Sequence, residues 1–506
     1  MAPAISVEEY PNLVRSLNVG SPIAEDDALL HEARIETSVF SEIMDDRVDI
    51  IRGTKGSGKS ALYRIFTKFL ADLMLENYQV IIVKAEDTTG DPIFLKFKPQ
   101  FEQLDEVDFQ NFWRIYFLSL IESQILSQAK YQSAFASAES EIKDFRKQAK
   151  ENGFPIIDKT FSPQGIIGWV LSKIPKPKSI GTKVGEVETT LELDTASVQQ
   201  EERVPLFVSS LHDALVRALV KCKLSLWLMV DRLDEVFPRR SEVERKALRG
   251  LLRTTTAFRD SRLRIKIFLR DDIFDSITDV SGGFPALTHV VSRCSDTLKW
   301  NKDQILHLIV NRIYASRTLT KYFSIDKDAL QTNPEHRSKA FYAIFPYKLR
   351  RGINQSDTLD WIYKHCEDAN GVVTPRDVID LINFAKRHQQ DAFQAHKTEM
   401  PSLLSSVSIL YGHQRMSEKK RETYLKAEFD HFWKFIERFE NRRAEYDERA
   451  MRSILGSDWR KVAQDLRSIG FIRFNPRSET YTVPFVYRHC LRIRQGREAS
   501  SSPQHH

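Results

Sequence analysis

Residues 48–66 read VDIIRGTKGSGKSALYRIF, and this stretch decides the fold prediction. An apolar run precedes a loop with three glycines in six residues, and apolar residues at helical spacing follow it. The loop fits the pattern G-x-x-x-x-G-K-[ST], with Gly53, Gly58, Lys59 and Ser60 at the fixed positions. A flexible Gly/Ser connector could match this pattern by chance. The strand before the loop and the helix after it favour a phosphate-binding loop in a parallel α/β sheet.

The chemistry of a phosphate chain explains the spacing of this loop. Glycine has no Cβ, so several backbone N–H groups can approach an anion closely. We expect Lys59 to neutralise the β- and γ-phosphates and the Ser60 hydroxyl to ligate Mg²⁺, which makes ATP and Mg²⁺ the expected cofactors. The residues expected to contact the nucleotide are Gly53, Thr54, Lys55, Gly56, Ser57, Gly58, Lys59, Ser60 and Ala61.

A second buried strand is predicted at residues 224–230, where a continuous apolar run ends at Asp231. Asp231 is the expected Walker B aspartate, which holds Mg²⁺ through water. Asp234 and Glu235 follow, and one of them is the expected base that orients the attacking water. We favour Glu235, although the spacing does not decide between the two. A solvated acidic loop is the alternative.

A third strand is predicted in the sequence LRIKIFLRDDIF, residues 263–274, with Arg270 at the end of its apolar run. Parallel strands carry their functional groups at their C-terminal ends. Arg270 is therefore placed to sense a γ-phosphate. The alternative is an exposed arginine that pairs with Asp271 or Asp272.

These three elements together resemble the AAA+/STAND branch of bacterial P-loop ATPases. Two further stretches, VVSRCSDTLKWNKDQILHLIVNRI and DWIYKHCEDANGVVTPRDVIDLINFAKR, resemble the lid region of that branch. The resemblance covers roughly residues 20–400, with weak similarity between about 87 and 205. It implies an ATPase core, and it implies that Arg293 occupies the position of an arginine finger offered to the next subunit of a homo-oligomer. Arg232 stands where many relatives carry a second acid, which leaves the identity of the base open.

The lid stretch can also be interpreted physically. Thr374, Pro375 and Asp377 supply an N-cap, a proline in the first helical turn and an acid at the third position. The helix therefore begins next to Arg376, which can reach the nucleotide as a second sensor. The alternative is an ordinary surface arginine on a well-capped helix.

The predicted fold class is α/β, with a three-layer P-loop NTPase core and a parallel sheet. The core spans residues 1–300, with a leader at 1–30 packed on it and a decorating insertion at 87–205. A helical lid follows at 301–400, a winged-helix-like domain at 401–497 and a disordered tail at 498–506. The order helix, helix, hairpin predicts the winged helix, with inward Trp459 and Leu466 on its second short helix.

The basic excess of the chain lies near its C-terminus. Residues 411–497 hold 20 Lys and Arg against 12 Asp and Glu, or +8, whereas the remaining 55 and 57 give −2, for a total of +6. Arg460, Lys461 and Arg467 are expected on an outward helix face, with Arg473 and Arg477 on or near the wing. This surface is a candidate contact for DNA phosphates. In related proteins a winged helix also closes on the nucleotide or binds protein.

Composition restricts the class of protein further. The four cysteines are scattered without a CxxC pair, which argues against a zinc site or a disulfide framework and favours a reducing cytoplasm. The first thirty residues lack a signal-peptide pattern, and the apolar runs are too short to cross a membrane.

Three functions remain open at the level of sequence. The first is an ATP-driven molecular switch, which the resemblance connects with phage defence or signalling through an effector protein. The second is a DNA-binding ATPase similar to origin-binding initiators. The third is a nucleotide-locked scaffold with little hydrolysis.

Overall fold

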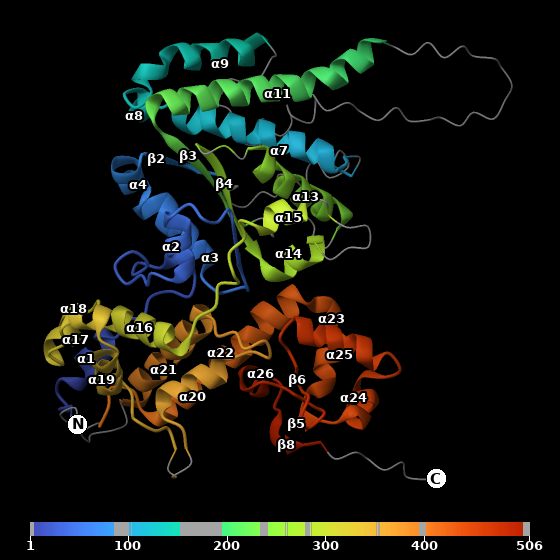
Figure 1. The fold of residues 1–506 in the computed structure, drawn as a ribbon. Helices are drawn as coiled ribbons and strands as arrows, with labels where there is room; N and C mark the ends of the chain where they lie inside the picture. The colour runs from blue at the N-terminus through green and yellow to red at the C-terminus, as the bar shows by residue number, and fades with distance from the viewer. Residues whose placement is uncertain are drawn as a thin grey trace. The chain divides into compact units, whose positions relative to one another are not determined.

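The computed structural model describes residues 5–85, 101–102, 104–151, 195–232, 241–258, 260, 262–278, 284, 286–350, 352, 355–393 and 401–498 (Figure 1). The chain divides into two compact units. The sheet unit comprises residues 38–54 and 59–297, and the terminal unit comprises residues 1–37, 55–58 and 298–506. This division differs from the predicted domains, because the leader expected on the ATPase core belongs to the terminal unit.

The sheet unit alternates strands with helices along the chain. Its elements are α2 (Ser38–Met44), β1 (Ile50–Gly53), α3 (Lys59–Arg64), the π-helical η2 (Ile65–Phe69), α4 (Ala71–Tyr78), β2 (Val80–Lys84), α7 (Glu106–Ile121), the π-helical η3 (Glu122–Leu126), α8 (Ala129–Gln132), the 3-10 helix η4 (Ala136–Ala138), α9 (Glu139–Glu151), α11 (Thr195–Cys222), β3 (Ser225–Val230), α13 (Glu242–Ala257), β4 (Leu263–Arg270), α14 (Asp271–Thr278) and α15 (Leu287–Val291).

Four parallel strands form the sheet in the order β1-β4-β3-β2. The strands are apolar almost throughout, which is typical of parallel strands covered on both faces. An α/β fold with a parallel sheet is therefore confirmed, and strands lie where the sequence predicted them before the loop, before Asp231 and before Arg270.

Helices cover both faces of this sheet. Leu228 of β3 and Ile265 of β4 point into the core that α7, α11 and α13 share. Side chains alternate along a strand, so Phe268 of β4 lies on the opposite face, where its ring meets Tyr63 of α3 edge-on with the centroids 5.8 Å apart. The helix that follows the glycine-rich loop thus packs directly on the sheet.

The helix α7 is a core element of the sheet unit. It lies within the region 87–205 that the sequence marks as an insertion, and it is buried along most of its length. The Trp113 indole N–H donates to the carbonyl of Ala247 in α13 at 2.9 Å. A Cβ added to Gly250 of α13 would lie 2.6 Å from Cβ of Phe109, so only glycine permits this close approach of the two helices.

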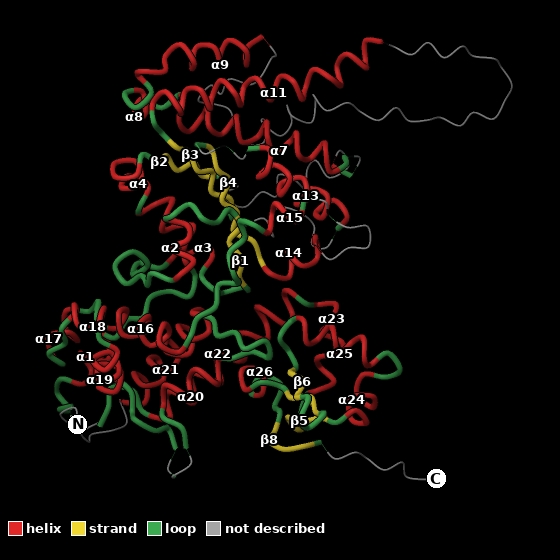
Figure 2. Tube along the Cα trace, in the orientation of Figure 1, coloured by secondary structure: helices red, strands yellow, loops and turns green. Residues whose placement is uncertain are grey.

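The terminal unit is largely helical, and its strands gather near the C-terminal end of the chain (Figure 2). Its elements are α1 (Tyr10–Ser16), the 3-10 helix η1 (Ala24–Asp26), α16 (Lys302–Ile313), α17 (Arg317–Tyr322), α18 (Lys327–Thr332), α19 (Pro334–Ile344), α20 (Thr358–Cys366), α21 (Pro375–Phe393), α22 (Ser406–Lys420), the π-helical η5 (Arg421–Lys426), α23 (Asp430–Ile436), the 3-10 helix η6 (Glu437–Phe439), β5 (Arg443–Tyr446), α24 (Glu448–Leu455), α25 (Trp459–Ser468), β6 (Arg473–Asn475), β7 (Thr480–Thr482), α26 (Phe485–Arg488) and β8 (Arg494–Arg497).

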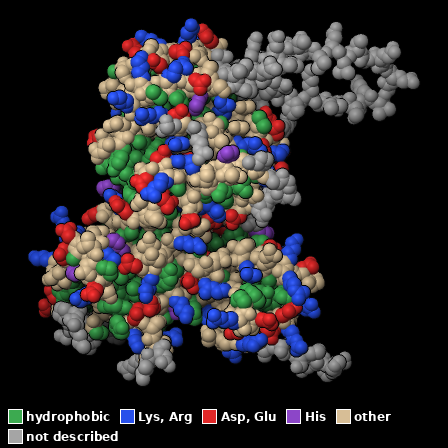
Figure 3. Space-filling view, viewed as in Figure 1, with side chains coloured by type: hydrophobic (Ala, Val, Ile, Leu, Met, Phe, Trp, Pro, Cys, Tyr) green, Lys and Arg blue, Asp and Glu red, His purple; other side chains and the backbone are tan. Residues whose placement is uncertain are grey.

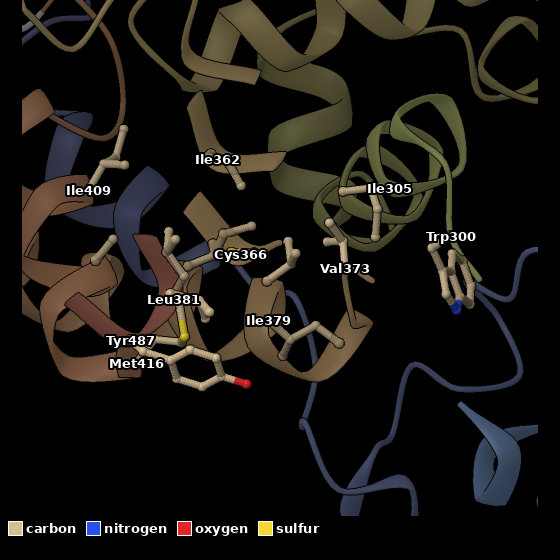
Figure 4. Close-up of a cluster of buried hydrophobic side chains, with 14 of the residues drawn as sticks. Trp300, Ile305, Ile362, Cys366, Val373, Ile379, Leu381, Ile409, Met416 and Tyr487 are labelled. Carbon is tan, nitrogen blue, oxygen red and sulfur yellow. The ribbon is translucent and has the colours of Figure 1, made fainter. Parts of the chain in front are cut away.

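One apolar core joins the N-terminal segment, the middle helices and the C-terminal elements of this unit. Figure 4 shows part of this core, where side chains of the middle helices meet Tyr487 of α26. The Tyr10 hydroxyl of α1 donates to the carbonyl of Leu403 at 2.6 Å. Arg312 of α16 pairs with Asp27 at 2.7 Å, and both side chains are buried. These contacts explain why the first residues of the chain group with residues beyond 298.

The C-terminal segment has a second sheet, in the order β6-β7-β5-β8. The hairpin of β6 and β7 is antiparallel, as predicted, and β7 also pairs with β5. The two short helices α24 and α25 pack on each other, with Trp459 and Leu466 buried. The predicted tail, residues 498–506, lies outside the described residues apart from Glu498. None of the helices in the described parts combines the length and the apolar character that a membrane crossing requires.

Candidate functional site

The glycine-rich loop connects the end of β1 to the start of α3. Gly56 has φ +87° and Gly58 has φ +106°, a region that side chains with a Cβ rarely adopt. The backbone conformation therefore requires glycine at positions 56 and 58. The loop also belongs to both units, because residues 55–58 group with the terminal unit and their neighbours group with the sheet unit.

The Lys59 ammonium lies inside this loop. The side chain is buried, and its Nζ donates to the carbonyl oxygens of Gly53 at 2.7 Å and Thr54 at 3.0 Å. A cation surrounded by the backbone of its own loop offers a fixed positive charge to an anion.

Two further hydroxyls of the loop are buried without a hydrogen-bond partner in the described part of the chain. They are Oγ1 of Thr54 and Oγ of Ser57. A buried hydroxyl without a partner is unfavourable by about 1–3 kcal/mol. These donors, together with Lys59, fit an anionic ligand that is rich in acceptors. Ser60 is half-buried as the second residue of α3, and Ala61 is half-buried after it.

The sheet brings the predicted strand-end residues to its carboxyl edge. Gly53 at the end of β1 is opposite Arg270 at the end of β4. Val230 of β3 pairs with Ile267, so Asp231 comes level with the next residue of β4. Asp231 is buried. The edge that carries the glycine-rich loop thus also carries the expected Walker B aspartate and the expected sensor.

The residue after Asp231 has an unusual backbone. Arg232 has φ +60°, which is uncommon for a residue with a long side chain. Strained backbone of this kind clusters at functional sites. The predicted bases Asp234 and Glu235 lie outside the described residues, so the choice between them stays a prediction.

Arg270 forms an ion pair with a neighbour in the next helix. Its Nε and Nη2 donate to the two carboxylate oxygens of Asp272 at 3.0 and 2.8 Å. This is one of the two pairings that the sequence left open for Arg270. The guanidinium of Arg270 is therefore already engaged by Asp272.

Arg376 lies against the loop. Asp377 N–H donates to Oγ1 of Thr374 at 3.2 Å and the Thr374 hydroxyl donates to Asp377 at 2.7 Å, so the predicted N-cap of α21 is present. A Cβ added to Gly56 would lie 3.1 Å from Cβ of Arg376. Within the described residues, the Arg376 guanidinium forms no hydrogen bond or ion pair, in contrast to Arg270.

Arg293 lies in an ion-pair network before β1. It donates to Asp49 at 3.1 Å and to Asp46 at 3.0 Å. Lys266, which is fully buried, donates to the same Asp49 at 3.2 Å. Desolvation lowers the pKa of Lys266, opposed by the charges of Asp49 and Asp46. These contacts engage Arg293 within its own chain, and its role as an arginine finger offered to a neighbouring subunit stays a prediction.

Sequence reasoning missed two side chains that contact the loop. The Trp300 indole N–H donates to the carbonyl of Ser57 at 2.7 Å, and Lys55 pairs with Glu428, whose side chain is buried. Trp300 lies in the lid-like stretch, where the pattern gave it no role, and Glu428 belongs to no motif. The contacts join positions 243 and 373 residues apart, so no local pattern could have indicated them.

No protein-family model matches the chain, and no curated protein matches its sequence significantly. In the described part of the chain, no group of three or more His, Cys, Asp or Glu side chains could hold a metal ion by itself.

Proposed function

We propose that this protein is an ATP-binding molecular switch that hydrolyses ATP. In this proposal the sheet unit is a P-loop NTPase core of the AAA+/STAND type, and residues 401–497 form a winged-helix-like domain. The observation that carries the proposal is the buried Lys59 ammonium, enclosed by the carbonyls of its own loop.

Each residue of the candidate site has its own role in this proposal. The loop N–H groups and Lys59 bind the phosphates, and the hydroxyls of Thr54 and Ser57 supply further donors. Ser60 and Asp231 would hold Mg²⁺, which supplies charge neutralisation at the phosphates when it is bound. Glu235 or Asp234 accepts a proton from the attacking water.

The switch requires a residue that distinguishes ATP from ADP. A ligand shifts a conformational equilibrium only by its differential affinity for the two states. Arg376 has a guanidinium without an ion pair in the described residues and lies against Gly56, which makes it the first choice. Arg270 can act only after leaving Asp272, and it is the second choice.

Release of phosphate under multiple turnover tests hydrolysis. The wild type should release many equivalents of phosphate from ATP, and Glu235→Gln should slow release while ATP still binds, because the amide keeps the shape and removes the base. If Asp234→Asn slows release instead, Asp234 is the base. If the wild type releases only one equivalent of phosphate per chain, the nucleotide-locked scaffold is favoured.

A second candidate function is binding of duplex DNA, and the exposed face of α25 favours it. Arg460, Lys461, Gln464 and Arg467 are exposed on this helix, and Asp465 is half-exposed beside them. Arg460 pairs with Glu448 at 2.6 Å, which reduces the free charge. On the face that Figure 3 shows, basic and acidic side chains are interspersed.

The hairpin contributes less to this surface than the sequence suggested. Arg473 donates to the carbonyls of Ala369 and Asp368 and pairs with Glu367 at 3.0 Å, so its guanidinium is engaged. Arg477 is exposed in the turn. Salt-dependent binding of duplex DNA by the full chain, lost in a Lys461→Glu/Arg467→Glu variant, would support this function, and no binding at low salt would exclude it.

A further inference from the structure

Residues 55–58 of the glycine-rich loop are held by side chains that come from far along the chain. Trp300 donates to the carbonyl of Ser57 at 2.7 Å, and its ring carbon Cζ2 would lie 3.8 Å from a Cβ added to Gly58. Arg376 lies against Gly56. The conformation of these loop residues therefore depends on α16, α21 and the segments next to them.

The strongest of these contacts is an ion pair. The Lys55 ammonium donates to a carboxylate oxygen of Glu428 and to the carbonyl of Thr423 at 3.3 Å. The Glu428 side chain is 2% exposed, whereas that of Lys55 is 28% exposed. A buried carboxylate that loses its cation is strongly destabilised, so the pair fixes the position of both partners.

The position of Lys55 connects this ion pair with the proposed nucleotide site. Lys55 is part of the loop that holds Lys59, and its flexible side chain carries the second positive charge of that loop. A triphosphate in the loop would attract the same ammonium that Glu428 attracts. We propose that Lys55 and Glu428 form an autoinhibitory latch, which a bound nucleotide opens by taking Lys55 away from Glu428. This inference rests on the proposed function, because it requires a polyphosphate in the loop.

The chain around Glu428 is suited to respond when the latch opens. The π-helical turn η5 ends two residues before Glu428, and π-helical turns are rare and frequently occur at functional sites. The helix α23 begins two residues after Glu428. When the latch opens, Glu428 loses its ion pair with Lys55, and α23 is the next element along the chain to be affected.

A simpler role for the pair is a permanent anchor of the loop. The two roles predict opposite effects of removing the carboxylate charge. An anchor that is lost leaves the loop less ordered, so nucleotide affinity falls or stays the same. A latch that is lost removes a competitor for Lys55, so nucleotide affinity rises.

Titration of the full chain with ATP and Mg²⁺ distinguishes these roles. Glu428→Gln should bind ATP about tenfold more tightly than the wild type, the equivalent of one charge-assisted hydrogen bond. Glu422→Gln is the matched control, because it removes an exposed carboxylate that pairs with Arg421 and Lys426, and its affinity should equal that of the wild type. Unchanged or weaker binding by Glu428→Gln would overturn the latch.

A double-mutant cycle shows whether Glu428 acts through Lys55. In a Lys55→Ala background, Glu428→Gln should no longer change the affinity for ATP. An equal gain in both backgrounds would overturn the proposal, since Glu428 would then act on the nucleotide by another route.

Hydrogen exchange of residues 421–436 provides a test that does not depend on the folding of Glu428→Gln. ATP should speed exchange of this segment in the wild type, and Lys55→Ala should exchange fast without ATP. Slow exchange in Lys55→Ala would overturn the latch. If the wild type binds no ATP at all, the proposed function fails and the latch with it. If the wild type binds ATP and Glu428→Gln binds no more tightly, the latch alone fails.

Discussion

Replacing Gly56 by alanine tests how closely the loop is packed. The change has two separate costs. Gly56 has φ +87°, and a residue with a Cβ in a left-handed conformation is destabilised by about 1–2 kcal/mol. The added Cβ would also lie 3.1 Å from Cβ of Arg376 and 3.4 Å from Oγ1 of Thr374.

The second cost follows from the rigidity of these neighbours. Cβ of Arg376 is fixed to the first turn of α21, and the Thr374 hydroxyl is held by Asp377, so neither atom can retreat freely. Crowding a well-packed site costs about 1–3 kcal/mol. Gly56→Ala should therefore destabilise the terminal unit by about 2–5 kcal/mol in total.

Gly371→Ala is the matched control for the backbone term. Gly371 has φ +76°, but the nearest atom to its added Cβ is Oε1 of Glu367 at 3.9 Å, so only the first cost applies. Urea denaturation followed by circular dichroism should place the Gly56 variant below the Gly371 variant in stability, and only the Gly56 variant should lose ATP affinity. Equal stability of the two variants would refute the packing of Arg376 against the loop.

Three further predictions concern packing, protonation and nucleotide discrimination. Gly412→Ala should destabilise the chain by about 1–3 kcal/mol in urea, because its Cβ would lie 2.4 Å from the carbonyl oxygen of Leu381; a neutral effect would contradict the close approach of α22 to α21. Burial lowers the pKa of His365 and His413 to about 3 from 6.5, so the unfolded chain binds protons that the folded chain does not. Stability should fall as the pH drops from about 6.5 toward 3, by about 1.4 kcal/mol per pH unit for each imidazole, and His413→Gln should make this fall less steep; the same slope in that variant would show that His413 does not titrate in this way. Arg376→Ala should weaken ATP by about 1–3 kcal/mol and leave ADP nearly unchanged, whereas equal losses in the two titrations would mean that Arg376 does not distinguish the nucleotides and would leave Arg270 as the candidate.

Patterns within short stretches of sequence predicted those elements of the fold that depend on neighbouring residues. The apolar runs predicted strands before Gly53, Asp231 and Arg270, and the residue pattern predicted the N-cap of the helix at Thr374. These features depend on residues within a few positions of each other. These predictions agree with the structure because side chains repeat with a fixed period along helices and strands, and because particular residue types cap the ends of helices.

Features that depend on distant residues were not predictable. The strand β8 pairs with β5 about fifty residues earlier, and neither strand has a strong β pattern. Lys55 and Glu428 are 373 residues apart, and an isolated glutamate after a helix carries no signal of its partner. The N-terminal leader was placed on the wrong unit for the same reason, because its contacts with Leu403 and Arg312 are long-range.

Binding of ATP to the full chain tests the central claim most directly. Isothermal titration with ATP and Mg²⁺ should show one site per chain in the wild type. Lys59→Met keeps most of the side-chain volume and removes the ammonium that donates to the carbonyls of Gly53 and Thr54. Because charge-assisted hydrogen bonds contribute about 1.5–3 kcal/mol each, this variant should bind ATP at least about tenfold more weakly. Equal affinity of the wild type and Lys59→Met, or no ATP binding by the wild type, would contradict the assignment of this loop as a nucleotide site.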